Sequence, residues 1–264
     1  MNIAIMMCGH MRTYKKNYEN FYNTHIRPNM NQNIDLFVVT SGVNSAREHL
    51  DPVIEPISEI KNDKKYYEGH GIIYDVDTDK LYKEIESQFS DQYYRLAGIH
   101  FVDEKIEDNN IDPMSWEWFR RGIFSKPYHA MQIVKEYQKE NNIKYDVVIR
   151  TRPDLNPLKL LVIERPEKNT VYAFGGPMST FQPWQAPDKY ENGMYINDGY
   201  AHGDLETMEK YASIYKRYEP YKTTVNEHPY NSENQLYLHL LKNNVNINYI
   251  FNHRNYYGIC RGDE

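Results

Sequence analysis

The sequence predicts an α/β fold with a largely parallel β-sheet that is covered by helices. Short apolar segments alternate with helical segments through the first 155 residues, which is the pattern of parallel strands joined by helices. Segment 145–151 carries three apolar residues in a row, Val147 to Ile149, as a strand buried on both faces does. The chain has 264 residues, of which 40% are hydrophobic and 26% charged, so it is globular and long enough for one large domain.

In the first half, apolar runs that end in polar or turn residues indicate strands. The predicted strands are Asn2–Met7, Asp35–Thr40, the weaker Gly71–Tyr74, Ile99–Val102 and Tyr145–Thr151. The predicted helices between them are Thr13–Tyr22, Asp79–Phe89, Ser115–Phe124 and Pro127–Glu140. Pro127 suits the first turn of a helix. Apolar residues of that helix recur on one face at the helical period: Ala130, Ile133, Val134 and Tyr137.

The second half is less regular. Residues 156–195 are rich in proline and glycine, and we expect one strand there followed by a long loop. The predicted elements are strand Val171–Phe174, helix Asp204–Arg217, helix Ser232–Lys242 and strand Ile247–Phe251. No repeat and no linker is visible, so we predict a single domain over residues 1–264, with halves 1–155 and 156–264.

Charge and composition exclude several classes of protein. The formal net charge of -6 disfavours a nucleic-acid groove, but it leaves room for local basic pockets that hold an anion. No apolar run approaches a membrane span, and the N-terminus has no signal-peptide pattern. Two cysteines, Cys8 and Cys260, make no disulfide framework, and there is no N-x-[ST] sequon. We therefore expect a cytoplasmic protein.

Polar residues follow the strands at the places where an α/β sheet binds its ligands. The stretch CGHMRTY follows the first strand, TSG the second and RTRPDL the central one. Ligands of open α/β sheets gather at the carboxyl ends of the strands, so Arg12, Arg150 and Arg152 are expected to converge. A guanidinium group binds phosphate oxygens through two hydrogen bonds at once, so several arginines together suit a diphosphate. Arginine at a strand end also forms structural salt bridges.

Asp154 belongs to the same stretch. A carboxylate beside phosphates is explained if a divalent metal bridges them, because Mg²⁺ takes one or two carboxylates together with phosphate oxygens. The glycine-rich signatures G-x-G-x-x-G and G-x-x-x-x-G-K-[ST] are missing. Dinucleotide oxidoreductases, common methyltransferases and P-loop kinases are therefore disfavoured.

Four segments in order resemble a group of small GT-A-type glycosyltransferases found in large DNA viruses, algae and bacteria. The segments are CGHMRTY, YDVVIRTRPDL, INDGYAHGDLETMEKY and SENQLYLHL, and together they span nearly the whole chain. The resemblance implies a GT-A-like fold, with a mixed, mostly parallel sheet flanked by helices. It also implies that residues 1–155 bind a nucleotide-diphosphate sugar and that residues 156–264 bind the acceptor.

The resemblance implies a donor site at the ends of the first strands and a metal site after the central strand. The implied donor residues are Gly9, His10, Arg12, Thr40, Ser41, Lys126, Arg150 and Arg152. Many GT-A enzymes carry Asp-x-Asp where this chain has Arg-Pro-Asp, so only Asp154 carries over as a ligand of Mn²⁺ or Mg²⁺. His253 after the last strand is the implied second ligand. A literal Asp-x-Asp occurs in YDVDTD, but Asp77 or Thr78 there is better explained as a helix N-cap.

The second half contributes the candidate acceptor and catalytic residues. The resemblance implies contacts from Asn197, Asp198 and His202 to the donor sugar or acceptor, although Asn-Asp-Gly also forms turns. Glu233 is a candidate catalytic base or a first-turn helical acid. Trp184 lies in FQPWQAP, a stretch that could stack on a sugar and close over the donor. Asp204 is predicted as a simple N-cap.

The sequence therefore predicts metal-assisted glycosyl transfer from a nucleotide-sugar to a hydroxyl acceptor, such as a glycan. Asp198 or Glu233 would deprotonate the acceptor if the reaction inverts configuration. Two alternatives stay open. One is a sugar nucleotidyltransferase, which usually carries a glycine-rich loop that CGHMRTY lacks. The other is a non-catalytic protein that binds glycans or nucleotide-sugars on a decayed transferase fold.

Overall fold

The computed structural model describes residues 1–11, 13–46, 65–67, 71–102, 116–157, 159–177, 194–221, 232–251 and 257–259. Its centre is a seven-stranded sheet in the order β11-β9-β10-β7-β1-β2-β6. The strands are β1 (Asn2–Cys8), β2 (Asn33–Ser41), β6 (Arg95–Val102), β7 (Val147–Thr151), β9 (Thr170–Pro177), β10 (Met194–Gly203) and β11 (Asn246–Phe251). The pairs β1–β2, β1–β7, β2–β6 and β9–β11 are parallel, whereas β10 runs antiparallel to β7 and β9. The predicted mixed, mostly parallel sheet is confirmed.

The remaining described strands form two smaller sheets. β12 (Tyr257–Ile259) pairs antiparallel with β8 (Leu155–Pro157). β3 (Val43–Ala46), β5 (Gly71–Asp75) and β4 (Lys65–Tyr67) form a separate sheet. The weak strand predicted at Gly71–Tyr74 therefore exists, but it lies outside the main sheet.

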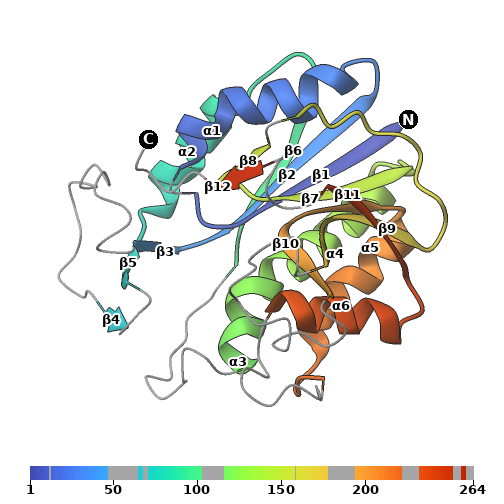
Figure 1. Ribbon diagram of the computed structural model, residues 1–264. Coiled ribbons are helices and arrows are strands. Elements are labelled where there is room, and N and C mark those ends of the chain that lie inside the picture. The colour runs from blue at the N-terminus through green and yellow to red at the C-terminus, as the bar shows by residue number, and fades with distance from the viewer. Residues whose placement is uncertain are drawn as a thin grey trace.

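Helices cover both faces of the main sheet (Figure 1). One face carries α1 (Tyr14–Phe21), the π-turn η1 (Tyr22–Ile26), the 3-10 turn η2 (Arg27–Asn29) and α2 (Thr78–Gln88). The opposite face carries α3 (Trp116–Phe119), the π-turn η3 (Arg120–Phe124), α4 (Ser125–Glu140), α5 (Leu205–Ala212), the 3-10 turn η7 (Ser213–Lys216) and α6 (Ser232–Lys242). The predicted helices are confirmed, with α4 beginning two residues before Pro127 and the predicted Asp204–Arg217 helix divided into α5 and η7.

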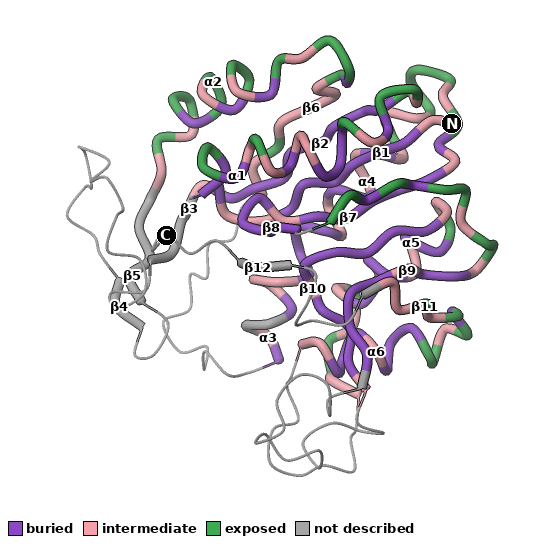
Figure 2. Tube along the Cα trace, turned by 45° about the horizontal axis from the view of Figure 1, so that its top comes forward, coloured by how far each residue is buried: buried purple, intermediate pink, exposed green. Residues whose placement is uncertain are grey.

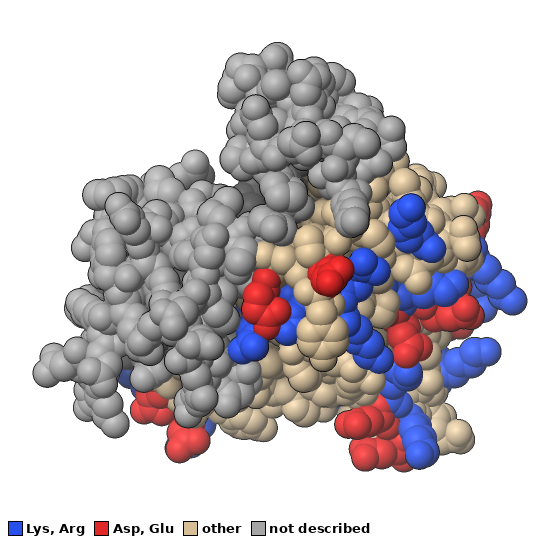
Figure 3. All heavy atoms as spheres, turned by 90° about the horizontal axis from the view of Figure 1, so that it is seen from below, with Lys and Arg blue, Asp and Glu red and all other residues tan. Residues whose placement is uncertain are grey.

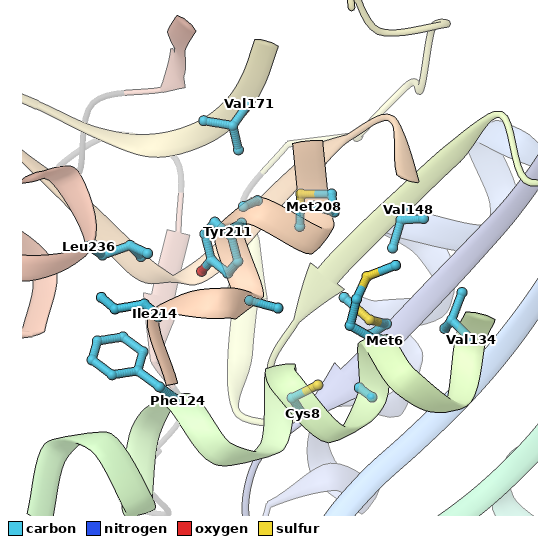
Figure 4. Packing of buried hydrophobic residues seen from close by; sticks show 14 of the residues in the cluster. Met6, Cys8, Phe124, Val134, Val148, Val171, Met208, Tyr211, Ile214 and Leu236 are labelled. Atoms are coloured by element: carbon cyan, nitrogen blue, oxygen red, sulfur yellow. The ribbon is translucent and has the colours of Figure 1, made fainter. Parts of the chain in front are cut away.

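The central strands are buried along their length (Figure 2). Their side chains alternate between two cores, one on each face of the sheet. In β1, Ile3 and Ile5 pack toward α1 and α2, whereas Met6 and Cys8 pack toward α4 and α5. Figure 4 shows the second core, in which Met6 and Cys8 face Met208 and Tyr211 of α5. Continuous apolar runs in these strands follow from burial on both sides.

Two predicted helix starts are confirmed. The Asp77 carboxylate accepts a hydrogen bond from the Lys80 amide at 3.0 Å, so Asp77 caps α2. The Asp204 carboxylate accepts one from the Thr207 amide at 2.7 Å and caps α5. The literal Asp-x-Asp of YDVDTD thus opens a helix, as predicted.

Strand β10 was not predicted. The sequence indicated a loop through residue 195 and a turn at Asn-Asp-Gly, yet Met194–Gly203 is a strand of the main sheet. The local pattern is misleading because the pairing with β9 shifts register between Ile196 and Ala201, which is a bulge. None of the described helices is long and apolar enough to cross a membrane.

Gly9 allows the loop after β1 to lie against the turn that follows β7. A Cβ atom on Gly9 would lie 2.8 Å from Cδ of Pro153. We therefore expect Gly9→Ala to lower the free energy of unfolding by about 1–3 kcal/mol, because the proline must shift. Urea denaturation measures this loss. Gly122→Ala is the control, since a Cβ there meets nothing within 4 Å; equal losses in both variants would contradict the proposed close contact.

Candidate functional site

The carboxyl ends of β1, β2 and β7 lie together at one edge of the sheet. The amide of Gly9 donates a hydrogen bond to the carbonyl of Val39 at 3.2 Å, so the loop after β1 continues along β2. Thr40 and Ser41 are buried at the end of β2. His10, the residue after Gly9, is half-buried, and Arg12 lies outside the described residues. The structure thus places four of the predicted donor residues, Gly9, His10, Thr40 and Ser41, at one edge.

Arg152 and Asp154 form a two-point ion pair just after β7. Nε of Arg152 donates to Oδ1 of Asp154 at 2.7 Å, and Nη2 donates to Oδ2 at 2.6 Å. Nη1 of Arg152 also lies 3.6 Å from Oδ2 of Asp198. The Asp154 side chain is only 4% exposed, so this carboxylate is held inside the protein by a cation. Arg152 therefore connects the turn after β7 to β10.

Arg150 and Lys126 are two buried cations on the side of the sheet that faces α4 and α5. Arg150 is 3% exposed and Lys126 2%. Both lie near Cys8: burial raises the pKa of the Cys8 thiol to about 12, and the positive charges of Arg150 and Lys126 oppose that rise. The Nε and Nη1 atoms of Arg150 are buried and have no hydrogen-bond acceptor among the described residues.

Two acidic residues from distant segments meet beside Arg152. Asp198 comes from the bulge of β10, and Glu233 comes from the first turn of α6. Nδ2 of Asn197 donates to Oε1 of Glu233 at 3.1 Å, which joins the two segments. Burial and, to a smaller extent, the negative charge of Asp198 raise the pKa of Glu233, Asn197 and Arg152 oppose the rise, and the resulting pKa is about 8. A carboxyl group with a pKa near neutrality can accept or donate a proton at physiological pH.

The Asn-Asp-Gly sequence explains the shape of this part of β10. Oδ1 of Asn197 accepts a hydrogen bond from the Gly199 amide at 2.7 Å, the short-range bond that asparagine forms in turns. A Cβ on Gly199 would lie 2.5 Å from that Oδ1 atom. The hydrogen bond typical of an Asn-Asp-Gly turn is therefore present, but it lies within strand β10. Because β10 is antiparallel to β7, its first residues lie next to the end of β7.

His202 does not join Asn197 and Asp198. It pairs with Ile149 in the interior of the sheet, and its ring stacks on Tyr172 with centroids 4.9 Å apart. Burial lowers the pKa of His202 to about 4, so the ring is neutral at pH 7. The position deeper along β10 places His202 in the packing of the sheet. Trp184 and His253 lie outside the described residues.

Several polar residues near the site were not singled out from the sequence. His25 and Thr151 contact each other under the end of β7, with Nε2 of His25 3.2 Å from Oγ1 of Thr151. Asn17 of α1 donates from Nδ2 to the carbonyl of Pro153 at 3.1 Å. No short-range pattern indicates these contacts, because each joins segments more than 120 residues apart.

The described residues contain no group of three His, Cys, Asp or Glu side chains placed to hold a metal ion. Asp154, the predicted metal ligand, accepts hydrogen bonds from Arg152 on both oxygens. Mg²⁺ at phosphate sites takes one or two carboxylates and completes its shell with phosphate oxygens and water.

No family model matches the chain, and no curated protein matches it. Among solved structures, the nucleoside-diphosphate-sugar pyrophosphorylase of Vibrio cholerae RC9 aligns with 100% of this chain and 96% of its own. The two chains share 12% sequence identity, with a TM-score of 0.43.

The raised pKa of Glu233 predicts a dependence of stability on pH. Between its ordinary value of 4.5 and about 8, the folded protein binds a proton at Glu233 that the unfolded chain has lost. The free energy of unfolding should therefore fall as pH rises through this window. We expect Glu233→Gln to remove that part of the slope in urea denaturation at pH 5 to 8. Glu206→Gln on the exposed side of α5 is the control, and identical slopes for wild type and Glu233→Gln would contradict the assignment.

Proposed function

We propose that this protein is a glycosyltransferase that moves a sugar from a nucleotide-diphosphate donor to a hydroxyl acceptor. The observation that carries the proposal is the buried Arg150, whose Nε and Nη1 have no acceptor among the described residues. A buried guanidinium with two unsatisfied donor atoms is costly to the folded state, so its retention is explained by an anionic ligand. Lys126 and Arg152 add two further cations near it.

The charges of the site suit a diphosphate. Lys126, Arg150 and Arg152 are cationic, Asp154 and Asp198 are anionic, and Glu233 with a pKa of about 8 is mostly neutral at pH 7. These side chains therefore carry an excess of positive charge inside a chain whose net charge is negative. On the face seen in Figure 3, basic and acidic side chains are interspersed over the described residues. A local excess of positive charge in a chain of negative net charge favours a small anion over a nucleic acid.

Glu233 is the proposed base of the transfer. The acceptor hydroxyl gives its proton to the Glu233 carboxylate, and its oxygen forms a bond to the anomeric carbon of the donor sugar. The bond from that carbon to the phosphate oxygen breaks, and its electron pair leaves with the nucleoside diphosphate. Asp198 keeps the pKa of Glu233 high, and Asn197 orients the carboxyl group. Arg150, Arg152 and Lys126 stabilise the negative charge that develops on the leaving group.

Mn²⁺ or Mg²⁺ is the proposed cofactor. Asp154 would hold the ion, which supplies further positive charge at the leaving diphosphate. His253 is the second proposed ligand, and Gly9, His10, Arg12, Thr40 and Ser41 are proposed to border the nucleotide. Trp184 is proposed to stack on the donor or acceptor sugar.

A sugar nucleotidyltransferase is the second candidate. Three cations at one edge of the sheet would also suit the larger negative charge of a nucleoside triphosphate. Glu233 favours the first candidate, because a phosphate that attacks another phosphate has no proton to lose to a base. The two activities differ in their products, since one releases a nucleoside diphosphate and the other consumes or releases pyrophosphate.

Arg150→Met tests the anion site. We expect the variant to melt at a higher temperature than the wild type without ligand, because an apolar side chain replaces a buried guanidinium with two unsatisfied donor atoms. We expect the wild type alone to be stabilised by UDP, GDP, dTDP or CMP compounds with Mn²⁺, by about 2.7 kcal/mol at a ligand concentration of 100 Kd. A thermal-shift screen measures both effects. Stabilisation of both proteins by the same nucleotide would exclude Arg150 from the site.

Glu233→Gln and Asp154→Asn test the reaction. We expect each to slow release of nucleoside diphosphate from nucleotide-sugars by about 100-fold or more, with folding retained. Coupled enzyme assays for nucleoside diphosphate and for pyrophosphate measure the products, and Glu206→Gln is the control on the exposed side of α5. Pyrophosphate as the product would establish the nucleotidyltransferase. Binding without any turnover would establish the non-catalytic alternative.

A further inference from the structure

The turn that carries Arg152 and Asp154 is held from the other face of the sheet by α1 and η1. Nδ2 of Asn17 donates to the carbonyl of Pro153 at 3.1 Å. Nδ2 of Asn20, one helical turn further, donates to the carbonyl of Pro157 at 3.2 Å. His25 of η1 contacts Thr151. Three polar side chains of one continuous helical segment thus reach the chain on both sides of Asp154.

The direction of the hydrogen bonds at His25 follows from its neighbours. Oγ1 of Thr24 donates its proton to the carbonyl of Asn20 at 2.7 Å. Thr24 must therefore accept from Nδ1 of His25, which lies 2.9 Å away. The other ring nitrogen, Nε2, is then the acceptor for the hydroxyl of Thr151 at 3.2 Å. These bonds form one relay from the backbone of α1 to the last residue of β7.

Burial stabilises this chain of hydrogen bonds against exchange with water. His25 is 2% exposed and Thr151 is fully buried, so each polar atom that lost its partner here would stay unsatisfied. Burial also lowers the pKa of His25 to about 3, which keeps the ring neutral and the tautomer unchanged at physiological pH. Asn17 is 5% exposed, and its bond to Pro153 is equally protected from water.

The anchored residues alternate with the charged ones. Thr151 and Pro153 contact the α1 side, whereas Arg150 and Arg152 interact with groups near α5, α6 and β10 on the other side. Successive residues of an extended chain point to opposite faces. A shift of Thr151 or Pro153 toward or away from α1 would therefore move both guanidinium groups relative to Asp154, Asp198 and Glu233.

We propose that Asn17 and His25 are positioning residues of the anion site, although neither lies on the face where the ligand would bind. They hold Thr151 and Pro153, and these two set the direction of Arg150 and Arg152. The inference rests on the proposed function, because it assigns a purpose to a contact that would otherwise serve packing alone. Partners that orient a binding group without touching the ligand are worth about 10- to 100-fold in affinity or activity at metal sites.

The chain offers a matched control in Asn29 of η2. Asn29 is 2% exposed and, like Asn17, ties this helical segment to a distant part of the chain. Its Nδ2 donates to the carbonyl of Leu161 at 2.8 Å and to the backbone carbonyl of His25 at 2.8 Å, and its Oδ1 accepts from the amide of Ile163 at 2.9 Å. None of these bonds involves the turn of Asp154 or the ring of His25. Loss of Asn29 therefore removes equivalent buried hydrogen bonds without releasing Pro153.

The test compares Asn17→Ala with Asn29→Ala and Thr151→Val with Thr151→Ser. Calorimetric titration with the nucleoside diphosphate that stabilises the wild type, with Mn²⁺ present, measures Kd, and urea denaturation measures stability. We expect Asn17→Ala and Thr151→Val to bind about tenfold more weakly or worse, and Asn29→Ala to bind as the wild type although it is less stable. Thr151→Ser retains the hydroxyl and should retain affinity. Equal affinities of all variants, or equal losses in Asn17→Ala and Asn29→Ala, would overturn the proposal.

A second measurement separates this inference from the proposed function. The Nε–Hε signal of Arg152 in ¹⁵N–¹H spectra reports its ion pair with Asp154 without any ligand. We expect that signal to shift in Asn17→Ala and to remain in place in Asn29→Ala. If the wild type binds no nucleotide, the proposed function fails while a shift confined to Asn17→Ala still supports the positioning role. An unchanged Arg152 signal in Asn17→Ala would overturn that role.

Discussion

The ion pair between Arg152 and Asp154 is the interaction on which the rest of the candidate site depends. It places a cation next to a carboxylate that is only 4% exposed, which offsets the cost of burying that carboxylate. The same guanidinium lies 3.6 Å from Asp198, which connects the turn after β7 to the bulge in β10. The charge of Arg152 also lowers the pKa of Glu233, which burial and Asp198 raise, so one guanidinium acts on three carboxyl groups.

A single antiparallel strand makes this arrangement possible. Because β10 enters the sheet at the end where β7 leaves it, Asn197 and Asp198 lie beside residues almost fifty positions earlier in the chain. α6 then places Glu233 against Asn197 at 3.1 Å. The site thus combines cations from the parallel strand β7 and helix α4 with acidic groups from the irregular half. Among the acidic groups, Asp154 comes from the same half as the cations, whereas Asp198 and Glu233 come from the other half.

The sequence predicted more of the fold than of the site. Strands β1, β2 and β7 were recognisable because burial on both faces produces continuous apolar runs. N-caps at Asp77 and Asp204 were recognisable because they depend on three or four consecutive residues. β10 was missed because a bulge carries turn residues into the middle of a strand. The resemblance grouped His202 with Asp198, and the structure pairs His202 with Ile149 in the sheet.

The sequence by itself determined the alternation of elements, the helix caps and the collection of arginines and an aspartate after one buried strand. These properties depend on neighbouring residues, so a linear pattern is enough to reveal them. Only the tertiary structure decided that Arg150 is buried with two donor atoms unpaired, that Glu233 lies near Asp198, and that Asn17 and His25 hold the turn from behind. These properties arise from contacts between segments distant in the chain, and their energies depend on burial, which no short stretch of sequence specifies.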